Sequence, residues 1–185
     1  NQAMVHTERA IQVDGGIRVA AGSRFNIRLG VSLASLKSPY FYTSIRDPYN
    51  PSGVSVGLPV DKFALIYDKK MSQLNPYAEV SYYHTDVFTT TLRVDYFQYK
   101  TDSLAEAWHR PTYRGDLRMK YNMFNKLFLQ AGFIFQGGMK AQDPTVAGAV
   151  QTLAVASDLN QKARYFFSRQ LSAFLQLDNL LGNQY

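Results

Sequence analysis

"RFNIRLGVSLAS", residues 24–35, alternates apolar and polar side chains almost without a break. The apolar positions share one face and are Phe25, Ile27, Leu29, Val31 and Leu33. The other face carries Arg24, Asn26, Arg28, Gly30 and Ser32. A side-chain period of two is typical of a β-strand whose two faces meet different surroundings. The apolar face of this strand therefore packs against either a protein core or lipid.

The same period recurs along most of the chain. Further alternating stretches occupy residues 11–21, 62–68, 76–83, 88–99, 112–122, 126–136, 158–167 and 170–179. No helical period of 3.6 extends beyond about ten residues. The sequence therefore predicts an all-β, antiparallel up-and-down protein, and residues 1–185 form a single domain.

The connections between these stretches alternate in length. Counting back from residue 179, they are short at 168–169, long at 137–157, short at 122–126 and long at 100–111. The alternation fails at 37–61 unless residues 40–46, "YFYTSIR", add a strand, with 69–75 then a modest outer loop. We therefore expect about 9–10 strands with short turns on one side, typical of outer-membrane barrels.

The polar face is charged at successive positions, which suits a water-filled lumen. The predicted lumen-facing residues are Arg24, Arg28, Arg114, Asp116, Arg118, Lys120, Lys162 and Arg164. Strands of about ten residues match the length that a tilted strand needs to cross a bilayer. Tyrosine and phenylalanine gather at strand ends, typical of membrane-interface girdles. These features predict a transmembrane barrel segment, with the five apolar residues of 24–35 facing lipid; a soluble sandwich or lipocalin-like barrel is the alternative.

The composition narrows the remaining classes. The chain has 185 residues, 20 Lys and Arg against 14 Asp and Glu, and no cysteine. No nucleic-acid-binding signature accompanies the basic charge, which is spread along the chain, so we expect no nucleic-acid partner. No apolar run is long enough for a helical membrane span. The first residues lack the pattern of a signal peptide, so we expect a processed chain or a fragment.

Residues for catalysis or metal binding are not grouped in the sequence. The three histidines are far apart, and no nucleophile motif or phosphate loop is present, so we expect no catalytic residue, metal or cofactor. Asp68 belongs to the acids expected to be ordinary loop residues. The best ligand candidate is Trp108, His109 and Arg110, predicted to form an exposed aromatic beside hydrogen-bond donors at a strand mouth, which suits recognition of sugars or chelates. The alternative is that Trp108 anchors the chain at the membrane interface.

Several motifs resemble the late barrel strands of TonB-dependent receptor-like outer-membrane proteins of the Bacteroidetes type. They are "AWHRPTY" at 107–113, "GGMKA" at 137–141, and an ending that runs from Leu175 through Asn179, Leu180 and Gly182 to Tyr185. The resemblance covers residues from about 60 onward and is weak before them. It implies a larger barrel with a plug domain, and uptake of a nutrient or metal chelate across the bacterial outer membrane with energy from TonB.

The chain departs from that family in having no plug and no TonB-contacting box. The resemblance implies a 22-stranded barrel, which ten strands cannot close, so we expect a fragment of a larger receptor. Its expected partners are then outer-membrane lipid and surface or periplasmic proteins. The resemblance adds a plug domain and TonB, which would be reached through the rest of the larger receptor, the parent protein. A passive or structural outer-membrane barrel within a surface complex is the first alternative, and a soluble all-β binding protein is the second.

Overall fold

The computed structural model describes residues 8–45, 62–142 and 149–182, with side chains from 11–42, 65–142 and 149–182. Every helix or strand element in these ranges is a β-strand. No helix in the described residues is long and apolar enough to cross a membrane. Parts of two predicted loops, 46–61 and 143–148, and the end of the terminal motif at 183–185 lie outside the described residues.

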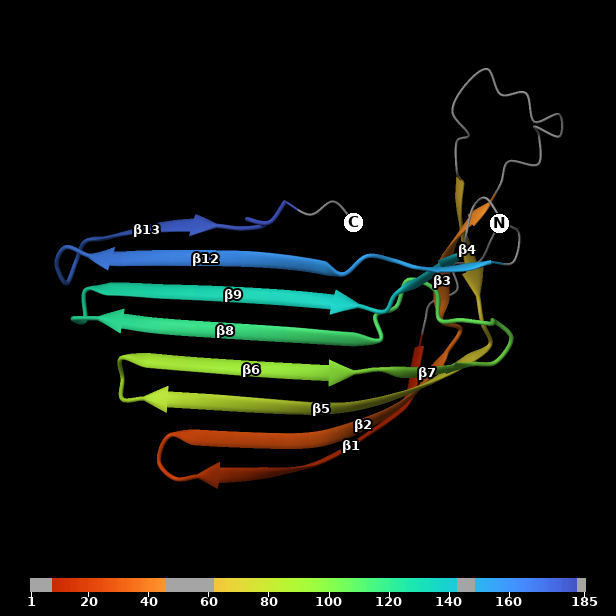
Figure 1. Ribbon diagram of the computed structural model, residues 1–185, viewed down its shortest axis with the longest axis horizontal. Helices are drawn as coiled ribbons and strands as arrows, with labels where there is room; N and C mark the ends of the chain where they lie inside the picture. Colours follow the sequence, from red (N-terminus) through yellow and green to blue (C-terminus); the bar gives the residue numbers. More distant parts are fainter. Residues whose placement is uncertain (1–7, 46–61, 143–148, 183–185) are drawn as a thin grey trace, which may run out of the picture.

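The long strands form one antiparallel sheet in which each strand pairs with the next long strand of the chain (Figure 1). They are β1 (Glu8–Ala21), β2 (Phe25–Lys37), β5 (Lys70–His84), β6 (Phe88–Tyr96), β8 (Tyr113–Met123), β9 (Leu127–Gly137), β12 (Ala156–Phe166) and β13 (Ser172–Leu177). The short β7 (Gln98–Thr101) prolongs β6 and pairs with β5 in the same register. The predicted all-β, antiparallel, up-and-down fold is confirmed.

Turns and long connections alternate along the sheet. The connections after β1, β5, β8 and β12 are short and lie at one end, which we call the turn end. The connections after β2, β7 and β9 are long and lie at the opposite end, which we call the loop end (Figure 1). Two small hairpins, β3 (Tyr40–Ile45) with β4 (Lys62–Tyr67) and β10 (Lys140–Gln142) with β11 (Val150–Thr152), belong to these long connections.

The prediction that residues 40–46 add a strand to the barrel wall is wrong. Residues 40–45 pair only with β4, so both strands form a hairpin outside the main sheet. The predicted loop 69–75 is also wrong, because β5 begins at Lys70 and continues through Pro76. Pro76 lies opposite Val31 of β2, between the parts of β5 that pair with β6 and with β7, and it has no N–H to donate to the ladder. The side-chain amide of Asn75 donates to the Tyr96 carbonyl at 3.1 Å, where β6 gives way to β7.

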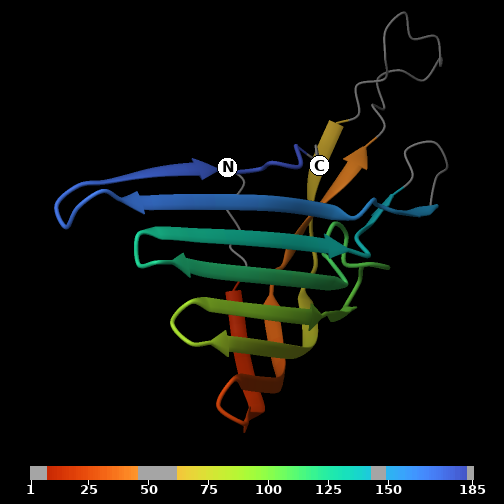
Figure 2. The same cartoon turned by 60° about the vertical axis from the view of Figure 1, so that its left-hand side comes forward.

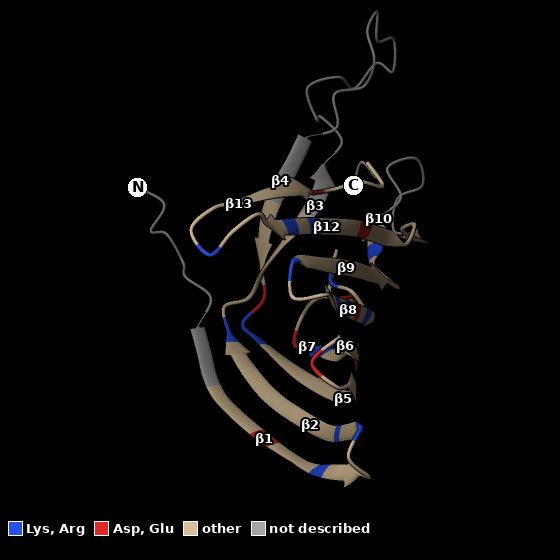
Figure 3. Cartoon of the chain, turned by 90° about the vertical axis from the view of Figure 1, so that its left-hand side faces the viewer, with Lys and Arg blue, Asp and Glu red and all other residues tan. Residues whose placement is uncertain are grey.

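The sheet is strongly curved across its strands (Figures 2 and 3). Among the described residues, the outer edges of β1 and β13 have no pairing strand, so the sheet is open. An open edge exposes unpaired backbone N–H and C=O groups, which closed barrels avoid. The chain therefore forms a curved section of wall rather than a closed barrel.

Candidate functional site

The two faces of the sheet are chemically distinct over its whole width. Leu29 of β2 lies opposite Ile17 on one side and Ala78 on the other, so the five apolar residues predicted to face lipid share a face with apolar neighbours. We call this the apolar face. The opposite face carries the predicted lumen residues of the strands, and we call it the polar face; these residues are Arg28, Arg114, Asp116, Arg118, Lys120, Lys162 and Arg164.

Arg24 is an exception among the predicted lumen-facing residues. It lies in the turn between β1 and β2 and is exposed, so it does not belong to the polar face of a strand. The alternation of residues 24–35 extends one residue too far because Gly22, with a φ of 65°, opens a turn that includes Ser23 and Arg24.

The polar face lies on the inside of the curve. Its residues Asn75, Ser81 and Asp95 are 7%, 6% and 8% exposed, whereas Leu29 and Leu92 on the apolar face are 46% and 42% exposed. Side chains converge on the inner surface of a curved sheet and splay apart on the outer one. Figure 3 shows the end-on curve and the charged residues along its strands.

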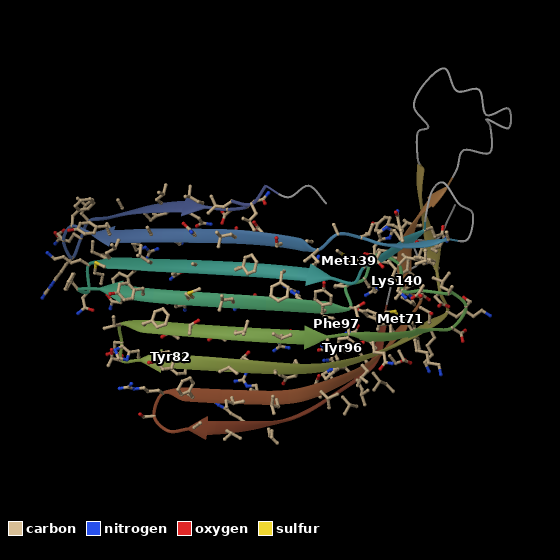
Figure 4. All side chains as sticks on the ribbon, viewed as in Figure 1. Met71, Tyr82, Tyr96, Phe97, Met139 and Lys140 are labelled. Carbon is tan, nitrogen blue, oxygen red and sulfur yellow. The ribbon has the colours of Figure 1, made fainter. Side chains whose placement is uncertain are left out.

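Aromatic side chains border the apolar face at both ends. Near the turn end, Phe25 packs against Tyr82 with ring centroids 4.9 Å apart, and Tyr82 is followed by Phe88 and Tyr121 at 6.4 and 6.5 Å steps. Near the loop end, Tyr96 lies directly opposite Tyr113. Figure 4 places Tyr82 and Tyr96 at opposite ends of the sheet.

The distance between these aromatic rows suits a bilayer. Tyr113 and Tyr121 lie on the same face of β8, eight residues apart, which is roughly 27 Å at about 3.4 Å per residue. For a strand tilted by about 35–45°, this length spans roughly 19–22 Å of height, a little less than the outward apolar band of about 25 Å that aromatic girdles border in transmembrane barrels. Not all predicted strand-end aromatics take part, because Tyr83, Tyr99 and Phe166 lie on the polar face.

An ion-pair network crosses the centre of the polar face. Arg93 pairs with Asp95 at 2.8 Å and with Glu79 at 3.9 Å, and Glu79 also pairs with Arg28 at 3.3 Å. Asn75 donates to Asp95 at 3.3 Å. Three strands are therefore joined by side chains that face the inside of the curve.

Tyr77 holds Arg93 in place within this network. The guanidinium carbon of Arg93 lies 4.2 Å from the centre of the Tyr77 ring, a cation–π contact. The ring itself covers Gly30 on β2, where a Cβ atom would lie only 2.6 Å from it. Gly30 is thus required by the close approach of the tyrosine ring.

A groove of about 400 Å³ opens beside the network. Its lining comes mainly from β6 and β8, with Glu79 from β5, and includes Arg93, Asp95, Arg114, Asp116 and Arg118. Arg118 pairs with Asp116 at 2.8 Å but its side chain is 71% exposed. Guanidinium groups and carboxylates in this arrangement can bind polar or charged ligands and other polar protein surfaces.

At the loop end, Asp68 organises the connection between β7 and β8. Its carboxylate accepts hydrogen bonds from the backbone N–H groups of Asp102, Ser103 and Leu104, from the Ser103 hydroxyl and from the Lys69 N–H. Asp68 is 2% exposed. Burial raises the pKa of this carboxyl, but the hydrogen bonds outweigh it and lower the pKa below its ordinary value.

The expectation that Asp68 is an ordinary loop acid is therefore wrong. Its carboxylate joins two connections that are 35 residues apart in sequence. The sequence carries only a weak signal for this role. Asp68 precedes a strand and Ser103 follows an Asp, but both patterns are common in loops and do not indicate that the two residues meet. Only the fold brings them together.

Trp108 is buried rather than exposed, which corrects the premise of the predicted ligand site. It is 5% exposed and packs with Phe41 and Met71 in a small core at the loop end. Met71 lies opposite Leu36 and Thr101, on the polar face of the sheet. The indole is thus enclosed between β3, β5 and the loop before β8, and it is not a membrane-interface anchor.

The neighbours of Trp108 are also committed to this core. The Arg110 guanidinium lies 5.2 Å from the centre of the Phe41 ring. His109 has a φ of 59°, and its N–H donates to the Lys140 carbonyl at 2.9 Å. The His109 Nδ1 atom is buried without a hydrogen-bond partner. The three predicted residues therefore lie together at the loop end, but they connect loops rather than present an aromatic surface.

β10 completes the loop cluster. The Lys140 ammonium pairs with the carboxylate of Glu106, and Figure 4 places Met139 and Lys140 beside the loop end of the sheet. Connections after β2, β7 and β9 therefore meet over one end of the polar face. In the described part of the chain, no group of three or more His, Cys, Asp or Glu residues could hold a metal ion.

The fold is similar to solved structures of an outer-membrane receptor. The ferripyoverdine receptor of the Pseudomonas aeruginosa outer membrane, bound to ferripyoverdine, matches with a TM-score of 0.60 and 17% identity over 93% of this chain. The P. aeruginosa FpvA structure with a heterologous pyoverdine gives the same values. The FpvAI–pyocin S2 complex matches with a TM-score of 0.59 and 17% identity over 92% of this chain.

These matches show that the chain has the fold of a section of an outer-membrane receptor barrel. The chain spans only 23% of the length of the first receptor and 22% of the third. No protein-family model and no curated protein matches the sequence.

Proposed function

We propose that this chain forms part of the barrel wall of a bacterial outer-membrane receptor that takes up a nutrient or metal chelate with energy from TonB. The observation that carries the proposal is the contrast between the two faces. An apolar face bordered by aromatic rows suits lipid, and a charged face on the inside of the curve suits a lumen. The likeness of the fold to the ferripyoverdine receptor supports the same assignment.

The polar face is the part of the wall that would meet the transported ligand or a plug domain. Its central ion pairs and groove supply donors and acceptors from the four adjacent strands β2, β5, β6 and β8. The plug domain and the contact with TonB belong to the parent protein by resemblance. The Bacteroidetes type rests on the "AWHRPTY", "GGMKA" and terminal motifs of the sequence alone.

A passive or structural outer-membrane barrel shares every feature of the wall and is the second candidate. It differs in having no need for TonB. A soluble binding protein is disfavoured by the exposure of large apolar side chains across the whole apolar face, for example Leu33 at 53%, Leu92 at 42% and Ile17 at 62%. We assign no catalytic role to the segment.

The test uses the full-length protein in its own host. Membrane fractionation and heat-modifiable migration on SDS gels examine the barrel, and uptake of candidate chelates with and without TonB examines the transport. We expect an outer-membrane, heat-modifiable protein whose uptake stops when TonB is depleted. Uptake that is independent of TonB would favour the passive barrel, and a soluble protein would overturn both.

A matched pair of variants links the uptake to the polar face. Arg114→Gln with Arg118→Gln changes two residues of the groove, and Arg169→Gln changes an exposed arginine in the turn before β13. We expect reduced uptake for the double variant and normal uptake for the control at equal surface amounts. Equal uptake by both would argue against ligand passage along this part of the wall.

A further inference from the structure

The apolar face carries charge at one place only among the described side chains. Its strand positions bear three charged residues, all of them lysines and all near the loop end: Lys37 of β2, Lys70 of β5 and Lys100 of β7. All three are exposed. A charge on a lipid-facing position is costly near the midplane and cheap near the interface, so their common position is informative.

The lysines lie close to one another. Lys37 and Lys70 are directly opposite in the β2–β5 ladder, and Lys100 is opposite Ser72, two residues from Lys70. Directly opposed like charges on one face destabilise a sheet unless another charge compensates. The acids nearest in register are Glu8, opposite Lys37, and Asp102, just beyond β7. None of the ion pairs between described side chains involves these lysines.

The cross-strand rows of side chains on the turn-end side of the lysines become more polar toward the loop end. Val13, Leu33 and Leu74 form one cross-strand row that ends at Gln98. The next row toward the loop end is mixed and contains Ile11, Ser35, Ser72 and Lys100. A groove of about 680 Å³ follows these rows and includes Lys70 and Lys100 in its lining. Polarity therefore rises toward the loop end, from a mainly apolar row through a mixed row to the opposed Lys37 and Lys70, as it does from the acyl chains to the headgroup of a lipid leaflet.

We propose that this groove binds an anionic lipid with a phosphorylated headgroup, with the acyl chains along Val13, Leu33 and Leu74 and the phosphate groups between Lys37, Lys70 and Lys100. The surplus of positive charge in a lipid-facing position supplies the complementarity to phosphate. An ammonium group acts as a point charge on a flexible stem and can reach a phosphate at the interface. The inference rests on the outer-membrane placement proposed above.

The test measures phosphorylated glycolipid bound to the full-length protein. The wild type and a variant with Lys37→Gln, Lys70→Gln and Lys100→Gln are reconstituted in vesicles of phosphatidylethanolamine with or without lipid A, and bound lipid A is measured by native mass spectrometry. A lysine near an anionic surface is worth a roughly fivefold change in binding, so the triple variant is expected to bind about a hundredfold more weakly. A control with Lys120→Gln, Lys126→Gln and Lys162→Gln removes equal charge away from the groove and is expected to bind as the wild type does.

The outcomes separate this inference from the proposed function. If all three proteins insert and are heat-modifiable but bind lipid A equally, the lipid site is wrong and the outer-membrane barrel stands. Loss of binding in the control alone also overturns the lipid site. Displacement of lipid A by millimolar inorganic phosphate overturns it as well, because the acyl chains would then contribute nothing to binding. If the wild type does not insert into vesicles, both proposals fail.

Discussion

The two faces of this sheet are built from the same strands but are stabilised in different ways. On the polar face, side chains are crowded and connected: Arg93 joins Glu79 and Asp95, and Tyr77 covers Gly30. On the apolar face, large side chains such as Leu29 and Leu92 remain about half exposed in the chain itself. The polar face is therefore satisfied by its own residues, whereas the apolar face depends on what surrounds it.

This difference shows how an alternating sequence encodes two environments at once. A slip of one residue in any ladder would exchange the faces of that strand. In this sheet such a slip would place guanidinium groups among the apolar side chains of the neighbouring strands, so the charged face fixes the register as firmly as the apolar face does. The following variants test that contrast.

Leu29→Arg is expected to give the largest effect. Leu29 lies between the two aromatic rows, and an arginine on the lipid face near the midplane costs about 2–4 kcal/mol. Ser32→Arg is the control, because it places the same side chain on the polar face of the same strand. The measurement is the free energy of unfolding of the full-length protein in vesicles. Equal losses for the two variants would contradict the assignment of the faces.

Arg93→Met tests the connected face. Its removal leaves Glu79 and Asp95 without their shared cation, and Asp95 is 8% exposed. Because the Arg93 side chain is still 37% exposed, we expect a loss of about 1–3 kcal/mol rather than the full cost of a buried pair. Arg118→Met removes a pair whose arginine is 71% exposed and should cost less than about 1 kcal/mol. Comparable losses for both, measured by denaturant unfolding, would mean that the Arg93 network stabilises the protein no more than the exposed Arg118–Asp116 pair does.

Gly115→Ala examines how closely the apolar face is packed. Gly115 lies directly opposite Phe135, and a Cβ atom there would be 2.2 Å from its ring. The ring has to turn from its present position, which we expect to cost about 1–2 kcal/mol. Gly132→Ala on the polar face has no atom within 4 Å of the new Cβ and serves as the control. A neutral Gly115→Ala variant in the same unfolding assay would show that Phe135 moves freely.

The sequence alone predicted the main sheet well because its information is local. A period of two identifies β2, β8 and β9 within one or two residues, and the lengths of the turns order them. The prediction failed at two places. Residues 40–46 have the period of a strand but pair outside the main sheet, and residues 69–75 have the composition of a loop but belong to β5 from Lys70 onward. From sequence alone, a strand of a separate hairpin looks like a strand of the main sheet, and a strand that continues through Pro76 looks like a loop. Only the pairing partners distinguish these cases.

The predicted site was less accurate than the predicted fold. Trp108, His109 and Arg110 do gather at a strand mouth, but the sequence gives no sign that Phe41 and Met71 enclose the indole. Asp68 is the opposite case, since it was predicted to be ordinary and instead anchors a loop. Both errors concern contacts between long connections, where distant residues meet and no periodicity guides the prediction.

Asp68→Asn tests whether the loop end depends on this carboxylate. Its pKa is lower in the folded protein than in the unfolded chain, so its stabilising contribution is present above the ordinary value of 3.8 and is lost as the pH falls below it. The protection of the amides at 102–104, expressed relative to their intrinsic exchange rates at each pH, should therefore decrease below about pH 3.8 in the wild type. In Asp68→Asn, the protection of these amides should be lower by about 1 kcal/mol at pH values above about 3.8 and should not change further as the pH falls.

The control for this loop is Asp86→Asn, which changes an exposed acid in the short turn between β5 and β6. It should leave the exchange of 102–104 and its pH dependence unchanged. Because Trp108 packs in the small core that the same loop completes, its fluorescence should follow the exchange in Asp68→Asn. Unchanged protection in Asp68→Asn would mean that the Trp108 core holds the loop in place. The hydrogen bonds of the Asp68 carboxylate would then form because the loop is already positioned.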